Sequence, residues 1–280
     1  MNFLEEDTQG IDLTTLGLGI SHKKGVMRFT SKYAITLSGM QEVLKLQKEL
    51  GIECRVYKND ADQVAAGELI LESFGDAGAL HKAWKISQNI FEHLSAIATY
   101  TSELLSTARE LNPTISIATT RKNFPGSKKL MIEAVMAGGG IAHRLGTYDS
   151  ILVFAQHRAF LKKRKELESA IKELKMKFPE KKINVEVESF AEALYFSQLG
   201  VDILQCEKMA FDTLKRCVAL KEKQPHLIIM ATGGITLENA KEYAQTGVDV
   251  LVTSSPYHAK PKDIKVTMEA LSEEIEPNAT

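Results

Sequence analysis

Residues 135–146, VMAGGGIAHRLG, place three glycines just before a histidine and an arginine. Glycine has no Cβ, so its backbone can come close to a ligand, and the planar guanidinium of Arg144 suits a carboxylate or a phosphate. Such glycines more commonly end a helix, here one that begins near Ser127 and ends at Gly138 with a left-handed cap. With His143 and Arg144 beside them, they predict one wall of an anion-binding site.

Two further cations stand upstream, where the strand-like segment TISIAT (114–119) is followed by TRKNFPG. In a βα barrel the functional groups come from the carboxyl ends of the strands and from the loops after them. Arg121 and Lys122 occupy that place. A solvated loop pair is the alternative interpretation, but together with His143 and Arg144 they predict a site that binds carboxylate groups.

Carboxylates accompany two later strands of the same series. Side chains alternate along a strand, so Glu186 and Glu188 share one face, and Glu207 follows the next strand. Carboxylates at a strand end can accept hydrogen bonds, hold a metal or stabilise a developing positive charge, whereas a salt bridge at the rim is the alternative. We predict that at least one of Glu186 and Glu207 is functional.

Glycines and hydroxyls end the last two strands, in ATGGIT (231–236) and TSSPYH (253–258). Gly233 and Gly234 leave backbone N–H groups available just before a helix that we expect from about Leu237, and such a helix start is a phosphate site. Ser254 and Ser255 add hydroxyls to the same place. The loops after the last two strands of a barrel often form a phosphate site, so the two signals support each other, although either alone is an ordinary βα turn.

These residues are positioned by short β-branched segments that alternate with amphipathic helical stretches. Six strand candidates occur in order: TISIAT (114–119), SILVFA (150–155), INVEV (183–187), VDILQ (201–205), HLIIMA (226–231) and VDVLVT (248–253). The helical stretches are 160–177, 190–199, 208–222 and 236–246. This succession predicts a βα barrel.

The first part of the chain has a different pattern. VMRFTS and IECRVY flank a helical QEVLKLQKEL, and ELILESF precedes a long helical run from about Asp76. We therefore predict a separate α+β domain over residues 1–110, followed by the barrel over 111–263. The segment IKVTMEAL (264–271) has strand character, and we expect the tail, 264–280, to pack back on the first domain.

Composition limits the class of partner. The 35 basic residues against 36 acidic ones leave a net charge of -1, so no overall field recruits nucleic acid or an anionic membrane. The N-terminal segment MNFLEEDTQG is acidic, and no apolar run approaches the ~20 residues that span a bilayer. These features predict a cytoplasmic protein without membrane insertion. Cys54, Cys206 and Cys217 contain no C-x-x-C pair, so neither a disulfide framework nor a thiolate zinc site is predicted.

Several of these motifs together resemble one enzyme family. ATTRKNFPG, AGGGIAHRLG, VEVES and ATGGI, with EDTQGIDLTT near the N-terminus and HLSAIAT at 93–99, are similar to nicotinate-nucleotide pyrophosphorylase, also called quinolinate phosphoribosyltransferase. GSKKLMIEAVMAGGGIAHR, ILVFAQHRAFL and TSSPYHAKPKDIKV resemble its ModD-type branch of pyrophosphorylases associated with molybdenum transport loci. The resemblance covers nearly the whole chain.

The resemblance implies an α/β fold: an N-terminal α/β sandwich domain and an incomplete βα barrel. It implies a homodimer in which the sandwich domain of one subunit faces the barrel of the other. It also implies 5-phosphoribosyl-1-pyrophosphate as cosubstrate and Mg²⁺ as metal. The acid-binding and catalytic cations of the family match Arg121, Lys122, His143 and Arg144, with Lys122 as the catalytic one.

Other matches carry changes. Glu186 matches a strand-end glutamate of the family, and Glu207 replaces an aspartate in an LDN context, which makes both implied catalytic carboxylates and Mg²⁺ ligands. The phosphate loop matches Thr232, Gly233 and Gly234. Lys85 stands where, as the resemblance implies, the family has an arginine that reaches the active site of the partner subunit. Phe154 stands where the family has a lysine, and it supplies an apolar wall to the acceptor site instead.

The sequence therefore predicts a phosphoribosyltransferase, a pentosyltransferase in which pyrophosphate leaves the anomeric carbon of the ribose and an aromatic nitrogen attacks it. A link to molybdenum transport or metabolism follows from the resemblance. One alternative is a non-catalytic protein that binds a phosphate or oxyanion ligand on the same scaffold. Another is a different phosphosugar enzyme that uses Lys122 as a Schiff-base nucleophile, which ranks last because Arg121 and His143 already explain its surroundings.

Overall fold

The computed structural model describes residues 3–161 and 163–271 and consists of two compact units. The first unit combines Met1–Thr99, Phe124–Gly138 and Ala259–Thr280, and the second combines Tyr100–Asn123 and Gly139–His258. The long helix α4 (Ala77–Arg109) contributes residues to both. The units are thus interleaved along the chain, whereas the sequence pattern suggested single ranges over 1–110 and 111–263.

An antiparallel sheet forms the centre of the first unit, with strand order β13-β1-β5-β3. Its strands are β1 (Lys24–Ser31), β3 (Glu53–Val56), β5 (Leu69–Asp76) and β13 (Ile264–Ala270). The other elements of this unit are α1 (Phe3–Thr8), α2 (Leu13–Gly17), α3 (Met40–Glu49), α5 (Lys128–Ala137) and the short pair β2 (Ile35–Thr36) and β4 (Gln63–Val64). Strand β13 pairs with β1 from Gly25↔Ala270 to Ser31↔Ile264. Residues 272–280 of the expected tail lie outside the described residues.

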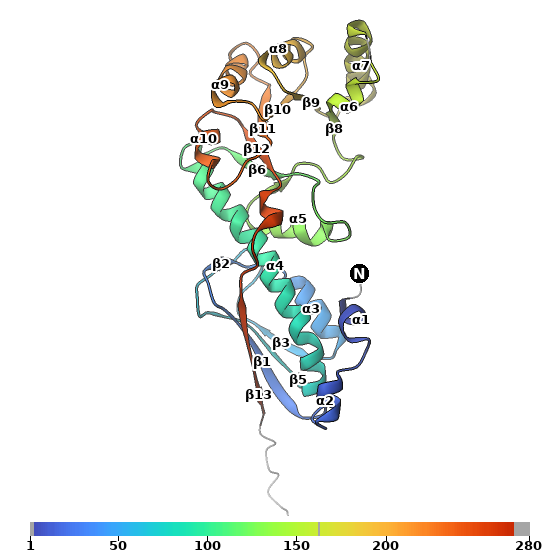
Figure 1. Cartoon of the computed structure of the whole chain (residues 1–280), viewed down its shortest axis with the longest axis vertical. Helices are drawn as coiled ribbons and strands as arrows, with labels where there is room; N and C mark the ends of the chain where they lie inside the picture. The colour runs from blue at the N-terminus through green and yellow to red at the C-terminus, as the bar shows by residue number, and fades with distance from the viewer. Residues whose placement is uncertain (1–2, 162, 272–280) are drawn as a thin grey trace, which may run out of the picture. The chain divides into compact units, whose positions relative to one another are not determined.

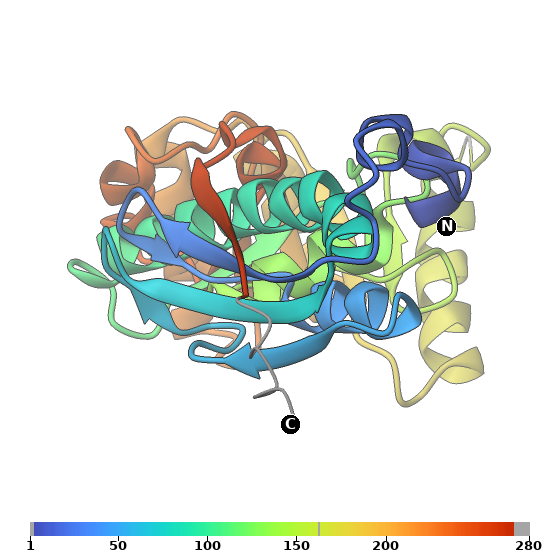
Figure 2. The same cartoon turned by 90° about the horizontal axis from the view of Figure 1, so that it is seen from below.

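Alternation along β1 explains how this sheet is covered. Phe29 is buried and packs edge-to-face on Phe91 of α4, with ring centroids 5.5 Å apart. The preceding residue, Arg28, points to the opposite face and donates from Nε to Glu72 of β5 at 2.8 Å. Figures 1 and 2 show α4 running alongside the sheet. One apolar face against helices and one charged face are what a two-layer α/β sandwich requires.

A seven-stranded parallel sheet forms the second unit, in the order β7-β6-β12-β11-β10-β9-β8. Its strands are β6 (Ser116–Thr119), β7 (Ile141–Ala142), β8 (Ile151–Val153), β9 (Ile183–Val187), β10 (Ile203–Glu207), β11 (Ile228–Thr232) and β12 (Val250–Thr253). The helices are α6 (Ala155–Arg158), α7 (Arg164–Lys177), α8 (Phe190–Gln198), α9 (Phe211–Ala219) and α10 (Ala240–Ala244), with 3₁₀ turns at Leu220–Glu222 and Ser255–His258. All six predicted strands are present, and β7 is an addition.

The two faces of this sheet are packed differently. Residues of the outer face, among them Val185 and Leu204, join the helices in the main core of the unit, and Figure 1 shows α8, α9 and α10 beside the strands. Val250 and Val252 belong to a second, small apolar cluster on the inner face. The sheet curls, but its edge strands β7 and β8 do not pair with each other, so the barrel is incomplete. This confirms the predicted fold class.

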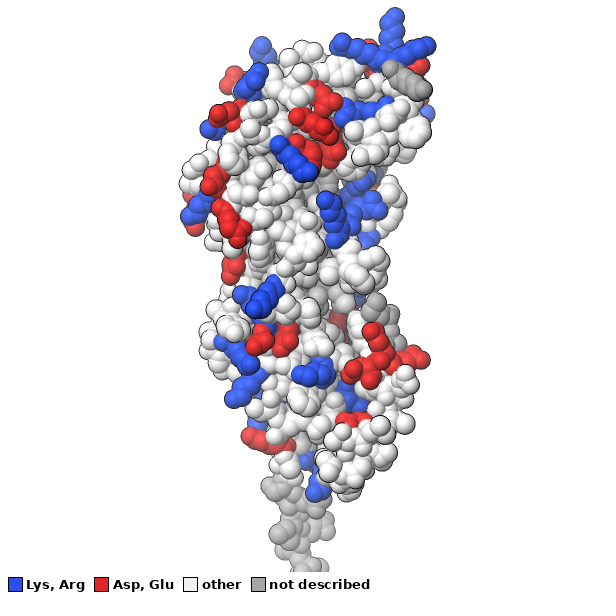
Figure 3. Space-filling view, in the orientation of Figure 1, with Lys and Arg blue, Asp and Glu red and all other residues white. Residues whose placement is uncertain are grey.

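The surface agrees with the near-neutral composition. In the space-filling view, acidic and basic side chains are interspersed over the visible face (Figure 3). Among residues 3–161 and 163–271, no helix has both the length and the apolar character that crossing a bilayer needs.

Candidate active site

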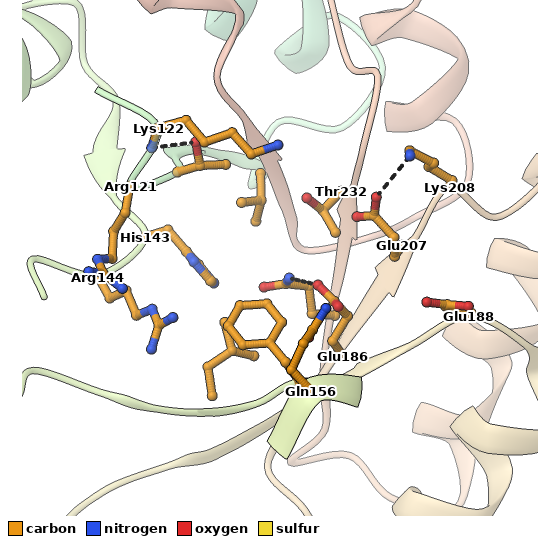
Figure 4. Close-up of a pocket in the computed structure, with 15 residues that line it drawn as sticks. Arg121, Lys122, His143, Arg144, Gln156, Glu186, Glu188, Glu207, Lys208 and Thr232 are labelled. Carbon is orange, nitrogen blue, oxygen red and sulfur yellow. Dashed lines mark hydrogen bonds and ion pairs between the residues drawn. The ribbon is translucent and has the colours of Figure 1, made fainter. Parts of the chain in front are cut away.

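A cavity of about 1060 Å³ opens at the carboxyl ends of the strands of the second unit, where barrel enzymes place their chemistry. It collects eight of the residues that the sequence suggested: Arg121, Lys122, His143, Arg144, Phe154, Glu186, Glu207 and Thr232. Figure 4 shows the four basic residues on one side, and the glutamates with Thr232 and Lys208 on the other. The cavity is therefore polar and divided by charge.

The basic side is short of compensating negative charge. Arg121 and Lys122 come from the loop after β6, and Arg144 comes from the segment after β7. Burial, together with the nearby charge of Arg121, lowers the pKa of Arg144 below its usual value. Within the described part of the chain, no carboxylate forms an ion pair with any of the three. Clustered cations without a partner favour an anionic ligand, and two guanidinium groups suit a carboxylate.

His143 contributes a neutral ring rather than a charge. Burial, and to a lesser degree the charge of Arg144, lowers its pKa to about 4. Its Nε2 lies 3.5 Å from the amide nitrogen of Asn184 on β9, and its backbone N–H donates to Thr119 at 3.0 Å. At neutral pH the ring can accept or donate a hydrogen bond, but it adds no positive charge to the pocket.

Phe154 joins the two edges of the open barrel. The guanidinium of Arg144, after β7, lies 5.3 Å from the centroid of its ring, which itself follows β8. On α6, the imidazole of His157 stacks on the same ring at 5.8 Å, and its Nδ1 accepts from the Phe154 backbone N–H at 3.0 Å. Phe154 therefore positions Arg144 by a cation–π contact while it lines the pocket.

Paired carboxylates form the opposite side. Burial raises the pKa of Glu186 on β9, and the nearby charge of Glu207 on β10 raises it further. Gln205 is buried on β10, opposite Glu186 in the strand register, and its Nε2 donates to Glu186 Oε2 at 2.9 Å. Glu207 forms an ion pair with Lys208, whose Nζ lies 3.6 Å from Glu207 Oε1 (Figure 4). This hydrogen bond and ion pair hold the two carboxylates toward the cavity.

The phosphate loop is only partly as expected. Gly233 and Gly234 have φ angles of +91° and +75°, in the left-handed region that favours glycine. The helix predicted from about Leu237 is present as α10, but it begins later, at Ala240, and has only 5 residues. The backbone N–H groups of Thr236 and Leu237 are taken by Asn239 Oδ1 at 2.9 Å and by the Tyr100 hydroxyl at 3.0 Å. These two donors are therefore already used, and phosphate binding by Thr232, Gly233 and Gly234 stays a prediction.

Ser254 and Ser255 lie beside this loop rather than in the lining of the cavity. The hydroxyl of Thr253 donates to the Ile235 carbonyl at 2.7 Å and lies 3.0 Å from the Ser255 hydroxyl. Sequence reasoning missed Thr253, which ties the end of β12 to the turn after β11. Both serines are half-buried.

The glycine run before His143 has a structural cause. Helix α5 ends with Gly138 as its C-cap at φ -79°, so the predicted left-handed cap at that residue is wrong. Gly139 adopts φ +81° instead, and a Cβ there would lie 3.0 Å from Leu105 of α4. The run therefore allows a tight turn into β7, and none of its glycines lines the cavity.

Lys85 belongs to the first unit and not to the unit that forms the cavity. It is exposed on α4, where its amine donates to Gln88 at 2.9 Å and lies 5.2 Å from the ring centroid of Trp84. Its predicted role across a dimer stays a prediction.

Comparison with known proteins supplies the family. The sequence matches "Quinolinate phosphoribosyl transferase, C-terminal domain" over residues 97–267 and the N-terminal domain of the same family over residues 12–95. The chain belongs to the quinolinate phosphoribosyltransferase family. This membership confirms the predicted class of enzyme, a phosphoribosyltransferase of the pentosyltransferase group.

Named relatives agree over almost full length. The chain is 36% identical to a "Putative pyrophosphorylase ModD" of Escherichia coli O6:H1, covering 95% of this chain and 94% of the relative. It is 30% identical to a "Probable nicotinate-nucleotide pyrophosphorylase (carboxylating)" of Methanothermobacter thermautotrophicus, over 93% and 94%. The crystal structure of NadC from Streptococcus pyogenes shares the fold, with a TM-score of 0.88 at 24% identity over 96% and 95% of the two chains.

Proposed function

We propose that this protein transfers ribose 5-phosphate from phosphoribosyl pyrophosphate to an aromatic nitrogen of a carboxylated acceptor and releases pyrophosphate. The observation that carries the proposal is the division of one cavity, in a chain of this family, into a cationic side and a side with paired glutamates (Figure 4). The cations suit the acid, and the glutamates suit the positive charge that develops on the ribose.

In this reaction the bond from the anomeric carbon to pyrophosphate breaks and a carbon–nitrogen bond forms. Arg121 and Arg144 hold the carboxylate of the acceptor, with the neutral His143 ring as a hydrogen-bonding partner. Lys122 stabilises the negative charge that grows on the departing pyrophosphate. Glu186 and Glu207 stabilise the oxocarbenium-like transition state or ligate the metal. Interactions that strengthen only as charge develops raise the rate rather than the ground-state affinity.

Mg²⁺ is the metal that we propose, and the residues fit it. Magnesium in such enzymes is commonly held by one or two carboxylates together with substrate phosphates. No group of three or more His, Cys, Asp or Glu side chains within residues 3–161 and 163–271 could hold a metal ion. Two glutamates facing one cavity therefore match a metal that arrives with its phosphate ligand, and Glu186 and Glu207 would hold it there. Bound Mg²⁺ would neutralise charge on the pyrophosphate leaving group.

The acceptor that we propose is a flat ring with fewer negative charges than quinolinate, because Phe154 offers an apolar face where a cation would be needed. The link to molybdenum transport or metabolism rests on the similarity to the ModD-named relatives. We also propose a homodimer with shared active sites, in which Lys85 completes the pocket of the neighbouring subunit. Location in the cytoplasm and the absence of nucleic-acid binding stay predictions from charge and composition.

Pyrophosphate release tests this function directly. The protein is incubated with phosphoribosyl pyrophosphate, Mg²⁺ and a panel of pyridine and azole carboxylates, and Glu186→Gln serves as the inactive control. Release that depends on one acceptor supports the transferase. Tight binding of phosphoribosyl pyrophosphate in a calorimeter without release across the panel would support the alternative, a non-catalytic protein for a phosphate or oxyanion ligand. If a lysine adduct is trapped by borohydride, the site works through Schiff-base chemistry instead.

A further inference from the structure

Lys208, directly after β10, has a backbone conformation that side chains rarely adopt. Its φ is +50°, and among the described residues only Gln9 and Ala61 are other non-glycine residues with positive φ. In this conformation the Cβ of an L-residue crowds its own backbone, which is why glycine and asparagine are usual there. Such strain clusters at functional sites, where the surrounding structure maintains it.

Two contacts maintain the conformation of Lys208. Its backbone N–H donates to the carbonyl of Thr232 at 2.8 Å, which continues the pairing of β10 with β11 by one residue. Its side chain then passes over Gly233, where an added Cβ would lie only 2.6 Å from Lys208 Cγ. The glycine of the expected phosphate loop thus leaves room for the first part of the lysine side chain.

Among the described residues that line the cavity, Lys208 is the one cation on the side of the glutamates. The other basic residues that line the cavity, Arg121, Lys122, His143 and Arg144, come from the ends of β6 and β7. Lys208 lies among Glu186, Glu188 and Glu207, which would repel an anionic phosphate. Its amine is 3.6 Å from Glu207, and its side chain is 75% exposed, so it can move from the carboxylate to a ligand. Figure 4 shows it beside Glu207 and Thr232.

We propose that Lys208 is a substrate-binding residue that contacts the phosphate groups of the phosphoribosyl donor, and that its strained backbone is retained because it aims the amine over the glycine loop. The inference rests on the proposed function, since it names the donor as the ligand. A lysine amine acts as a compact point charge on phosphate, and contacts with an ionised partner are about twice as strong as neutral ones. It also offsets the repulsion from the three glutamates.

The test separates charge from strain. Lys208→Gln removes the charge and keeps a side chain at positive φ, Lys208→Arg keeps the charge, and Lys208→Gly removes both the charge and the strain. Lys215→Gln is the matched control, because Lys215 is an exposed lysine of α9 that pairs with Asp212 at 3.5 Å. Calorimetry with Mg²⁺ measures the affinity for phosphoribosyl pyrophosphate and for inorganic pyrophosphate, and thermal unfolding measures the midpoint.

We expect Lys208→Gln and Lys208→Gly to weaken the binding of both ligands about tenfold, which corresponds to 1.4 kcal/mol. Lys208→Arg should stay within about threefold of the wild type, since it keeps the charge. The unfolding midpoint should rise by about 2–4 °C in Lys208→Gly only, because relief of strain stabilises the fold. A purely structural residue would not lose affinity while gaining stability.

Two results would overturn the inference, and only one of them would also overturn the proposed function. If the wild type binds phosphoribosyl pyrophosphate and Lys208→Gln binds it equally well, the lysine does not contact the donor, although the proposed function stands. If the wild type binds neither ligand, the proposed function fails and the role of Lys208 fails with it.

Discussion

Gly233 offers a sharp test of how the glycine loop supports the glutamates, because its neighbour Gly234 is a built-in control. Both residues have left-handed φ angles, +91° and +75°. A Cβ on Gly233 would lie 2.6 Å from Lys208 Cγ and 2.8 Å from Glu207 Oε1, whereas a Cβ on Gly234 would meet no atom within 4 Å. Alanine at either position therefore causes the same kind of backbone strain, but only one alanine disturbs the site.

The magnitudes follow from these contacts. A non-glycine residue in the left-handed region costs about 1–2 kcal/mol, and this should be the whole effect of Gly234→Ala on the free energy of unfolding. Gly233→Ala should add about 1–3 kcal/mol of overpacking, unless Glu207 and Lys208 move away. Because both contacts are with side-chain atoms, movement is the easier response. A displacement of about 1 Å at a reacting centre can reduce the rate about 100-fold.

The assay compares kcat/KM for pyrophosphate release with the urea midpoint in both variants. Gly234→Ala should lose stability and keep activity within a few-fold, whereas Gly233→Ala should lose activity about 100-fold or more. Equal activity in the two alanine variants would refute the reasoning, because it would show that the position of Glu207 beside Gly233 does not matter to the reaction.

Three further outcomes are expected. Quinolinate should be used about 100-fold less efficiently than the best acceptor, since a lost charge-assisted contact costs about 1.5–3 kcal/mol. Phe154→Lys should narrow this difference in kcat/KM between the two acceptors, measured in the steady state. An unchanged ratio of the two kcat/KM values would contradict the proposed role of Phe154. Because the pKa of His143 is lowered from 6.5 to about 4, the unfolded chain binds the extra proton first as the pH falls. Through this residue the free energy of unfolding should decrease by about 2–3 kcal/mol between pH 7 and pH 4. The urea midpoint should therefore fall less with pH in His143→Asn than in the wild type. Parallel dependences of the midpoint on pH in the two proteins would show that His143 has no such effect. Mixing inactive Lys85→Ala and Lys122→Ala chains should restore part of the activity through hybrid dimers, and mixed dimers that stay inactive would show that the sites are not shared.

The strands of the second unit were predictable because their physical signature is strong. A parallel sheet covered by helices needs short apolar, β-branched segments, and INVEV coincides with β9, while VDILQ and HLIIMA begin two residues before β10 and β11. Strand β7 has only two residues, Ile141 and Ala142, and its place depends on pairing with β6 rather than on its own composition. The helix expected after Gly234 begins at Ala240 rather than near Leu237, for a related reason. Asn239 and Tyr100 capture the backbone donors of that turn, and Tyr100 is distant in the sequence.

In the candidate site, too, some residues could be predicted from local sequence and others depend on contacts distant in the sequence. Strand alternation and the rule that barrel chemistry lies at strand ends placed Arg121, Glu186 and Glu207 correctly in the cavity. The same alternation puts Gln205 on the face of Glu207, so its contact with Glu186 could have been anticipated. The positive φ of Lys208 could not, because nothing in the segment QCEKM indicates it and the carbonyl of Thr232 that fixes it lies on another strand.

The contact between Arg144 and Phe154 shows why the charges in the sequence are insufficient to identify the acceptor. Arg144 follows the edge strand β7 and Phe154 follows the opposite edge strand β8, yet their side chains meet at 5.3 Å. The aromatic ring therefore fixes the direction of the Arg144 guanidinium, and it stands where the resemblance implies a lysine in the family. Because His143 is neutral beside them, the proposed acid acceptor would meet fewer positive charges than the motif AHR alone suggests. Under the proposed function, selectivity for the acceptor would then depend on the contact between the two barrel edges. Phe154→Lys should therefore change the position of Arg144 as well as the charge of the pocket.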